Sequence, residues 1–210
     1  VSELDLTDTR NTLRKSPEGN MIAVGAKRFV EQVDELVRAA QTRRQSAVMK
    51  AADLPEQQNR VKAAFDKVLA QNNALGKAFG TQEAFAALAK AHEDLMRAPQ
   101  AATPDATYAA HTAFLDAALD LVGAIANGSN LALDPDLDTY HLMNYGVLAG
   151  PYQYENLSKI AAMGALALST RELTPARRDA LTESSALLAF IDKGIETSYA
   201  QVVADALGAP

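Results

Sequence analysis

The chain has 210 residues, a net charge of −6, and neither cysteine nor tryptophan. The lack of cysteine excludes disulfides, thiolate metal sites and cysteine nucleophiles, and an acidic balance without a block of Lys and Arg argues against nucleic acid as a partner. Alanine is abundant and aromatic residues make up only 6%, which is typical of a chain built almost wholly of helices. The longest apolar run, residues 108–126, carries Asp116 and Asp120, so we expect no membrane span.

A long first helix is predicted over residues 20–51, after a shorter helical segment at residues 2–15. Its apolar residues recur at steps of four and three, the repeat of a helical bundle seam; they are Ile22, Ala26, Phe29, Val33, Leu36 and Ala40. At 1.5 Å per residue this helix would be roughly 48 Å long. We expect it to act as a strut.

Shorter helices are predicted in the middle of the chain. Asp53 marks the start of one that ends at Gly80, and Thr81 starts the next. A linker rich in Pro and small residues, residues 97–106, then leads to a helix over residues 107–127. The intervening helices therefore lie within residues 53–170.

The last part of the chain predicts two more helices. One runs from Pro135 to about Thr170, with a kink at Gly150-Pro151, because proline removes a backbone donor. The other covers residues 175–207 and forms the second long strut. Its apolar seam comprises Leu188, Ile191, Ile195, Tyr199, Val202 and Ala206.

These elements predict an all-α fold. We expect residues 1–210 to form a single elongated antiparallel helical bundle; the alternative is a bundle of two stacked four-helix modules that share the long first and last helices. Those two helices would pair antiparallel and bring both ends of the domain to one pole.

An acidic stretch, NLALDPDLDTYHLMN at residues 130–144, raises the question of a metal site. An EF-hand calcium loop that starts at Asp134 needs Gly at its sixth position and Glu at its twelfth. The sequence has Thr139 and Tyr145 there. We therefore predict no metal site in this stretch.

The start of a helix explains the acidic stretch better. Asp134 suits the N-cap, Pro135 the first helical position, and Asp136 the first turn, where it faces the positive end of the helix. Catalysis by paired carboxylates needs acids with separated pKa values, which adjacent aspartates at a solvated helix start do not offer.

No other catalytic pattern stands out. The sequence has no nucleophile elbow, no P-loop, no dinucleotide fingerprint after a strand and no HExxH. None of its three histidines, His92, His111 and His141, has a second histidine at ligand spacing. We predict no catalytic residue, no metal ligand and no cofactor.

The segment from His111 to Leu168 resembles the helical extracytoplasmic sensor domain of bacterial transmembrane receptors. Those receptors are sensor histidine kinases, methyl-accepting chemotaxis receptors and some cyclic-di-nucleotide enzymes. The family pattern is a His in a helix, a small-residue turn, and L-x-L-D-P-D-x-D-S/T-Y-x-L-M. The matching positions here are His111, Leu131, Leu133, Asp134, Pro135, Asp136, Asp138, Thr139, Tyr140, Leu142 and Met143.

The resemblance has limits along the chain. It departs from the family at GPYQYEN, residues 150–156, where relatives more often show Leu-Pro. Over residues 21–98 it rests on helix order, and residues 1–20 match nothing in the pattern.

The resemblance implies a periplasmic, homodimeric, all-helical input module of an inner-membrane receptor. A sensor histidine kinase is favoured as the parent; a chemotaxis receptor and a non-sensing structural or protein-binding bundle are the alternatives. The chain opens on Val1, and we expect it to be a piece of a longer protein that reaches the membrane only through flanking transmembrane helices. Its partner would be an unknown small molecule or a periplasmic protein.

Ligand sites in helical bundles form where polar groups interrupt an apolar seam. Six residues meet that description: Tyr108, His111, Tyr140, His141, Asn144 and Tyr145. A buried structural role is favoured for His111 and Tyr140. Arg43 and Arg44 could bind a carboxylate, but we expect them on a solvated face. The sequence predicts no ligand class.

Overall fold

The computed structural model describes residues 17–97, 103–129, 141 and 143–206. These residues form helices and no strand, which confirms the all-α prediction. The elements are α2 (Pro17–Val48), α3 (Leu54–Phe79), α4 (Gln82–Arg97), α5 (Pro104–Gly128), the π-helix η2 (Asn144–Ala149), α7 (Gly150–Thr170) and α8 (Pro175–Ala206). The predicted segment at residues 2–15 and the predicted helix start at Asp134, Pro135 and Asp136 lie outside the described residues.

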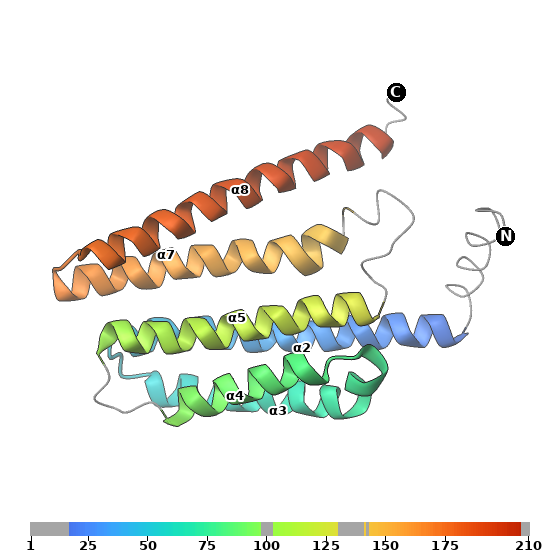
Figure 1. Ribbon diagram of the computed structural model, residues 1–210, viewed down its shortest axis with the longest axis horizontal. Coiled ribbons are helices and arrows are strands. Elements are labelled where there is room, and N and C mark those ends of the chain that lie inside the picture. The colour runs from blue at the N-terminus through green and yellow to red at the C-terminus, as the bar shows by residue number, and fades with distance from the viewer. Residues whose placement is uncertain (1–16, 98–102, 130–140, 142, 207–210) are drawn as a thin grey trace.

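The main apolar core lies within a four-helix bundle formed by α2, α3, α4 and α5 (Figure 1). Five residues of the predicted α2 seam are fully buried, whereas Ile22 at its start is 48% exposed. The side chains with the least exposure in this core include Phe29, Val33, Leu36, Val61, Val68, Leu88, Phe114, Leu115, Leu121 and Ile125. At about 1.5–3 kcal/mol for each large apolar side chain, this burial is the main stabilising term of the fold.

The hairpin formed by α7 and α8 lies beside this bundle (Figure 1). Helix α7 packs against α2 and α5, and α8 packs against α7 and η2. The expected pairing of the first and last long helices is therefore wrong, since α7 separates them. The reason is the short turn after Thr170, where Arg171 adopts a left-handed φ of 55° and folds α8 directly back onto α7.

The N-terminus of α2 and the C-terminus of α8 nevertheless lie at the same end of the molecule. The first residues of α2 and the last residues of α8 both lie at the right of Figure 1. This agrees with the expectation that both ends of the domain share one pole. The two helices are connected through contacts of α2 with α7 and of α7 with α8.

Local sequence explains most helix ends. Thr103 caps α5, because its Oγ1 accepts a hydrogen bond from the Ala106 N–H at 3.2 Å. Asp53 holds the N-cap position of α3 as expected, but its carboxylate accepts from the Gln57 side chain at 3.1 Å and makes no backbone cap bond. Gly128 lies so close to α3 that a Cβ there would come within 1.8 Å of the Phe79 carbonyl oxygen.

At Gly150-Pro151, where the sequence predicts a kink, the π-helix η2 passes into α7. The Gly150 N–H bonds to the Tyr145 carbonyl oxygen, five residues back. A Cβ on Gly150 would lie 2.7 Å from that oxygen, so only glycine fits the wider turn without displacing it. Single π-helical turns of this kind are frequent at functional sites.

Helix α5 packs against α2, α4 and α7 and contributes many of the buried core residues. In the part of the chain that the structure describes, it alone is long and apolar enough to cross a membrane, and half of that stretch is buried inside the bundle. A central core helix explains this composition.

Candidate functional site

A buried ion pair joins the bundle to the hairpin. Arg44 on α2 donates from Nη1 to Glu155 Oε1 at 2.7 Å and from Nη2 to Glu155 Oε2 at 3.2 Å. The two side chains are 0% and 1% exposed. Gln41, one turn earlier on α2, also donates to Glu155 Oε2, at 3.0 Å. Removing two charges from water is costly unless they are paired and hydrogen-bonded, and this pair meets both conditions.

Helices α5 and α7 complete the surroundings of Arg44. Its guanidinium donates to Thr112 Oγ1 at 3.2 Å and to Ser158 Oγ at 2.7 Å. The guanidinium carbon also lies 5.4 Å from the ring centre of Tyr108, within the range of a cation–π contact. Burial raises the pKa of Tyr108, so its hydroxyl stays protonated. Arg44 thus ties α2, α5 and α7 together.

A second buried contact links Arg43 to His111. Arg43 Nη1 lies 2.7 Å from His111 Nε2, and His111 Nδ1 lies 2.7 Å from the Thr107 carbonyl oxygen. Since a guanidinium can only donate, Nε2 must accept and Nδ1 must carry the proton. Burial, with smaller contributions from both arginines, lowers the pKa of His111 to about 4. The imidazole is therefore neutral at physiological pH.

The expectation that Arg43 and Arg44 lie on a solvated face is wrong. The residues are 8% and 0% exposed. The α2 seam already contained the signal, because Arg43 and Arg44 follow the buried Ala40 by three and four residues and so continue its inward face. Charge alone suggested solvent, while the helical repeat placed both side chains inside.

His92 on α4 is a second histidine that packs within the bundle, where it is half-buried. Its ring stacks on Phe65 with centroids 4.0 Å apart and an interplanar angle of 7°. Burial lowers the pKa of His92, and Arg43 lowers it further. His92 therefore packs as a neutral aromatic ring.

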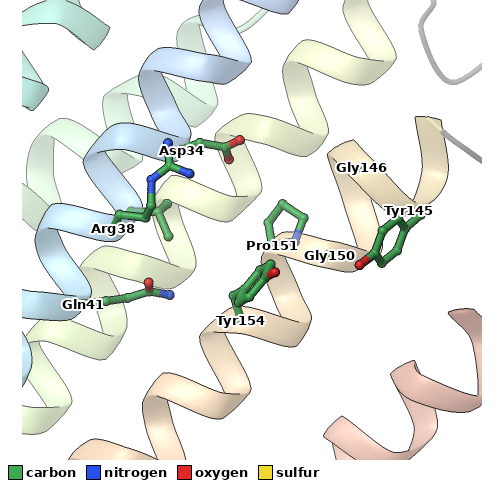
Figure 2. A pocket seen from close by; sticks show the side chains of 9 residues that line it. Asp34, Arg38, Gln41, Tyr145, Gly146, Gly150, Pro151 and Tyr154 are labelled. Atoms are coloured by element: carbon green, nitrogen blue, oxygen red, sulfur yellow. The ribbon is translucent and has the colours of Figure 1, made fainter.

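A cleft of about 390 Å³ opens between α2 and the junction of η2 with α7 (Figure 2). Asp34, Val37, Arg38 and Gln41 extend from α2 on one wall. The opposite wall consists of Tyr145, Gly146, Gly150, Pro151 and Tyr154. The volume lies within the range of small-molecule sites.

The α2 wall of the cleft contains an acid, Asp34, a base, Arg38, and an amide, Gln41. Burial raises the pKa of Asp34, although the nearby Arg38 opposes that shift. Gln41 connects the cleft to the buried layer, because its amide donates to Glu155. A molecule in the cleft would thus sit one hydrogen bond away from the ion pair that joins the two parts of the fold.

A smaller cleft of about 220 Å³ lies on the other side of η2, against α8. Its walls include Asn144 and Tyr145 from η2 and Phe190, Ile191 and Ile195 from α8. Tyr145 lines both clefts. The π-helix therefore stands between the larger cleft and the last helix.

The predicted ligand residues separate into two places. Tyr108 and His111 lie in the buried polar layer, where His111 is 2% exposed. Asn144 and Tyr145 lie at the clefts, and His141 is half-buried. Tyr140 lies outside the described residues.

Sequence reasoning missed Glu155 and the polar cleft residues of α2, which are Asp34, Arg38 and Gln41. Glu155 falls in GPYQYEN, the segment that departs from the family pattern, and its partner Arg44 is 111 residues away along the chain. No local pattern reports a pairing over that separation. Among the described residues, no group of three or more His, Asp and Glu side chains could hold a metal ion.

The comparisons with known proteins add no assignment. No protein-family model matches the chain, and neither a curated protein nor a solved structure matches it significantly. The function must therefore be argued from the residues and their geometry.

Proposed function

We propose that the chain is the periplasmic signal-input domain of a homodimeric bacterial transmembrane receptor. A sensor histidine kinase is the favoured parent, and a methyl-accepting chemotaxis receptor is the alternative. The sequence resemblance motivates this assignment. The observation that supports it in the structure is the cleft between α2 and the start of α7, which lies where the first long helix meets the hairpin that contains the last one.

The position of the cleft gives ligand binding a mechanical effect. A molecule that contacts both walls would change the separation of α2 from α7, and α8 would move with α7 because the two helices are in contact and joined by a short turn. Helix displacements of about 1–2 Å are a common form of signal transmission between helices. The start of α2 and the end of α8 lie at one end of the molecule (Figure 1). Such a displacement would therefore reach the transmembrane helices that this proposal places before α2 and after α8.

The Arg44–Glu155 pair acts in this proposal as the pivot of the movement. Its bonds fix the second turn of α7 to α2 and α5, directly beside the cleft, because Glu155 follows the cleft residue Tyr154. Closure or opening of the cleft would therefore tilt the hairpin about the ion pair. A ligand shifts this equilibrium only by its difference in affinity for the two arrangements.

The first experiment is a thermal-shift screen against organic acids, amino acids, aromatic acids, purines and polyamines. A ligand at 100 times its Kd adds about 2.7 kcal/mol to the free energy of unfolding and raises the Tm by several degrees. A compound that stabilises the protein then enters the second experiment. A screen without any stabilising compound would contradict small-molecule sensing.

The second experiment measures the movement itself. The chain has no cysteine, so pairs of introduced cysteines can be spin-labelled cleanly. We expect the ligand to change the distance distribution between labels at Lys27 on α2 and Glu196 on α8, both exposed. A pair at Lys27 and Lys62, within the bundle, serves as the control. Equal distributions with and without ligand for both pairs would refute the proposed mechanism.

A protein-binding bundle is the second candidate, because large apolar side chains are exposed on the hairpin. Leu168 is 80%, Phe190 75% and Tyr199 69% exposed. Exposed apolar patches often mark contacts with other proteins. Substituting Phe190 and Tyr199 by Ser separates the candidates: a sensor keeps its small-molecule response, whereas a pure binding module loses its partner and shows no such response.

A further inference from the structure

We infer that the cleft between α2 and η2 binds a zwitterionic α-amino acid with an apolar side chain, whose ammonium group pairs with Asp34 and whose carboxylate pairs with Arg38. This inference rests on the proposed function, because it names the ligand class of the same cleft. It is argued from the charges, the rings and the size of the cleft.

One acid and one base line the cleft from the same helix. Asp34 and Arg38 are four residues apart on α2 and therefore share a face, separated by roughly 6 Å along the axis. Both line the cleft, and no ion pair within 4.0 Å joins them, unlike the neighbouring Glu35, which lies 2.7 Å from Lys67 on α3. Both charges are thus available to a ligand.

The surroundings of Asp34 favour an incoming cation. The side chain is half-buried, and loss of hydration disfavours its charged form, as its raised pKa shows. A bound ammonium group would replace the missing water and stabilise the carboxylate. Arg38 is exposed and can swing its guanidinium towards a carboxylate with two parallel hydrogen bonds.

The opposite wall suits an apolar side chain. Pro151 and the ring of Tyr154 lie on the side of α7 that faces α2, whereas the ring of Tyr145, which also lines the cleft, lies beside Gly150 on the side away from α2 (Figure 2). The two tyrosines are 42% and 63% exposed, so apolar area remains to be covered. Tyrosine rings also attract an ammonium group at their faces. The wall therefore offers contacts to the body of an amino acid as well as to its charged end.

The charge pattern disfavours ligands that carry one sign only. A simple amine would satisfy Asp34 and bring a positive charge towards Arg38, and a simple acid would meet Arg38 and repel Asp34. The volume of about 390 Å³ is near the lower end for small-molecule pockets. That size favours a single amino acid over a peptide.

The test uses calorimetric titration and thermal shift of the intact chain with the standard L-amino acids. For L-leucine and L-phenylalanine, the matched amines without the carboxylate and the matched acids without the ammonium group are titrated in parallel. We expect at least one apolar amino acid to bind and both of its one-charge analogues to bind at least tenfold more weakly.

Two variants test the assigned contacts. We expect Asp34→Asn and Arg38→Gln each to weaken binding of the amino acid about tenfold or more, with the Asp34 variant losing discrimination against the acid analogue. The Glu35 side chain pairs with Lys67 on α3 and does not line the cleft. The control variant Glu35→Gln therefore removes a neighbouring charge and should leave the affinity unchanged. The Tm of each unliganded variant shows whether the fold is intact.

The outcomes separate this inference from the proposed function. Failure of all amino acids to bind, equal binding of an amine, or unchanged affinity in both variants would overturn the ligand class. An amino acid that binds as described without moving α8 relative to α2 would support the ligand class and overturn the sensing mechanism.

Discussion

Arg44 Nη1 lies 2.7 Å from Glu155 Oε1, and the structure exposes neither side chain to more than 1%. This ion pair connects the first long helix to the hairpin that carries the last. Buried pairs contribute less to stability than their geometry suggests, because both ions lose their hydration. Removing one partner is a different case, since it leaves the other charge buried alone.

We therefore predict that Glu155→Gln and Arg44→Met each lower the free energy of unfolding by about 3 kcal/mol. The double variant Arg44→Met with Glu155→Met should cost less than the sum of the two single changes, because no lone charge remains. Urea unfolding followed by circular dichroism gives all three values. Strict additivity would show that the two residues act independently.

His111 gives the protein a defined pH dependence. The pKa of His111 is about 4 in the fold and 6.5 for the free side chain, so the unfolded chain binds more protons between these values. Stability from this group is fully present above pH 6.5, is lost as the pH falls from 6.5 towards 4, and changes no further below that. The total loss is on the order of 3 kcal/mol.

The variant His111→Gln isolates that contribution. A glutamine amide can accept from Arg43 and donate to the Thr107 carbonyl without titrating. We expect the stability difference between the native chain and the variant to narrow or reverse as the pH falls from 7 to 4. Parallel pH profiles would mean that His111 titrates alike in the folded and unfolded chains.

Two glycines of α5 provide a matched pair of substitutions. A Cβ at Gly128 would come within 1.8 Å of the Phe79 carbonyl oxygen, whereas one at Gly123 meets nothing within 4 Å. Gly128→Ala should cost about 3 kcal/mol, because the ends of α3 and α5 must separate. Gly123→Ala should stabilise by about 0.5–1 kcal/mol through helix propensity. Thermal unfolding of both variants checks the difference, and equal midpoints would contradict the close approach.

Arg177 holds the turn between α7 and α8 against the start of α5. Its guanidinium donates to both carboxylate oxygens of Asp105, at 2.8 and 2.7 Å, and to the Glu172 carbonyl oxygen at 2.8 Å. We predict that Arg177→Met lowers stability by about 2 kcal/mol and speeds amide hydrogen exchange in α8. The adjacent Arg178 is exposed, so Arg178→Met should change stability by less than about 0.5 kcal/mol.

The sequence predicts the helices of this fold well, because periodicity and breakers act locally. The predicted ends at Gly80 and Thr170 match the structure. The seam from Ala26 to Ala40 is buried as expected, since apolar residues at helical spacing can only share a face. Local patterns of this kind need no knowledge of the neighbouring helix.

The relationships between distant helices were harder to predict. Similar length suggested that the first and last helices pair, but length does not specify a partner, and the tight turn at Arg171 placed α8 on α7 instead. The α2 repeat places Arg44 on the inward face, but its partner Glu155 lies more than a hundred residues later. Such a pairing is decided by tertiary packing, which one sequence does not display.

The polar character of the joint between hairpin and bundle has a thermal consequence. The main apolar cluster lies within α2 to α5, while the joint contains an ion pair, an amide and hydroxyl groups. Hydration of polar groups lowers the heat capacity, whereas exposure of apolar surface raises it. Opening of the joint should therefore vary little with temperature, although the stability of the bundle follows a strongly curved profile. Under the proposed sensing mechanism, the response to a ligand should therefore be similar in the cold and in the warm.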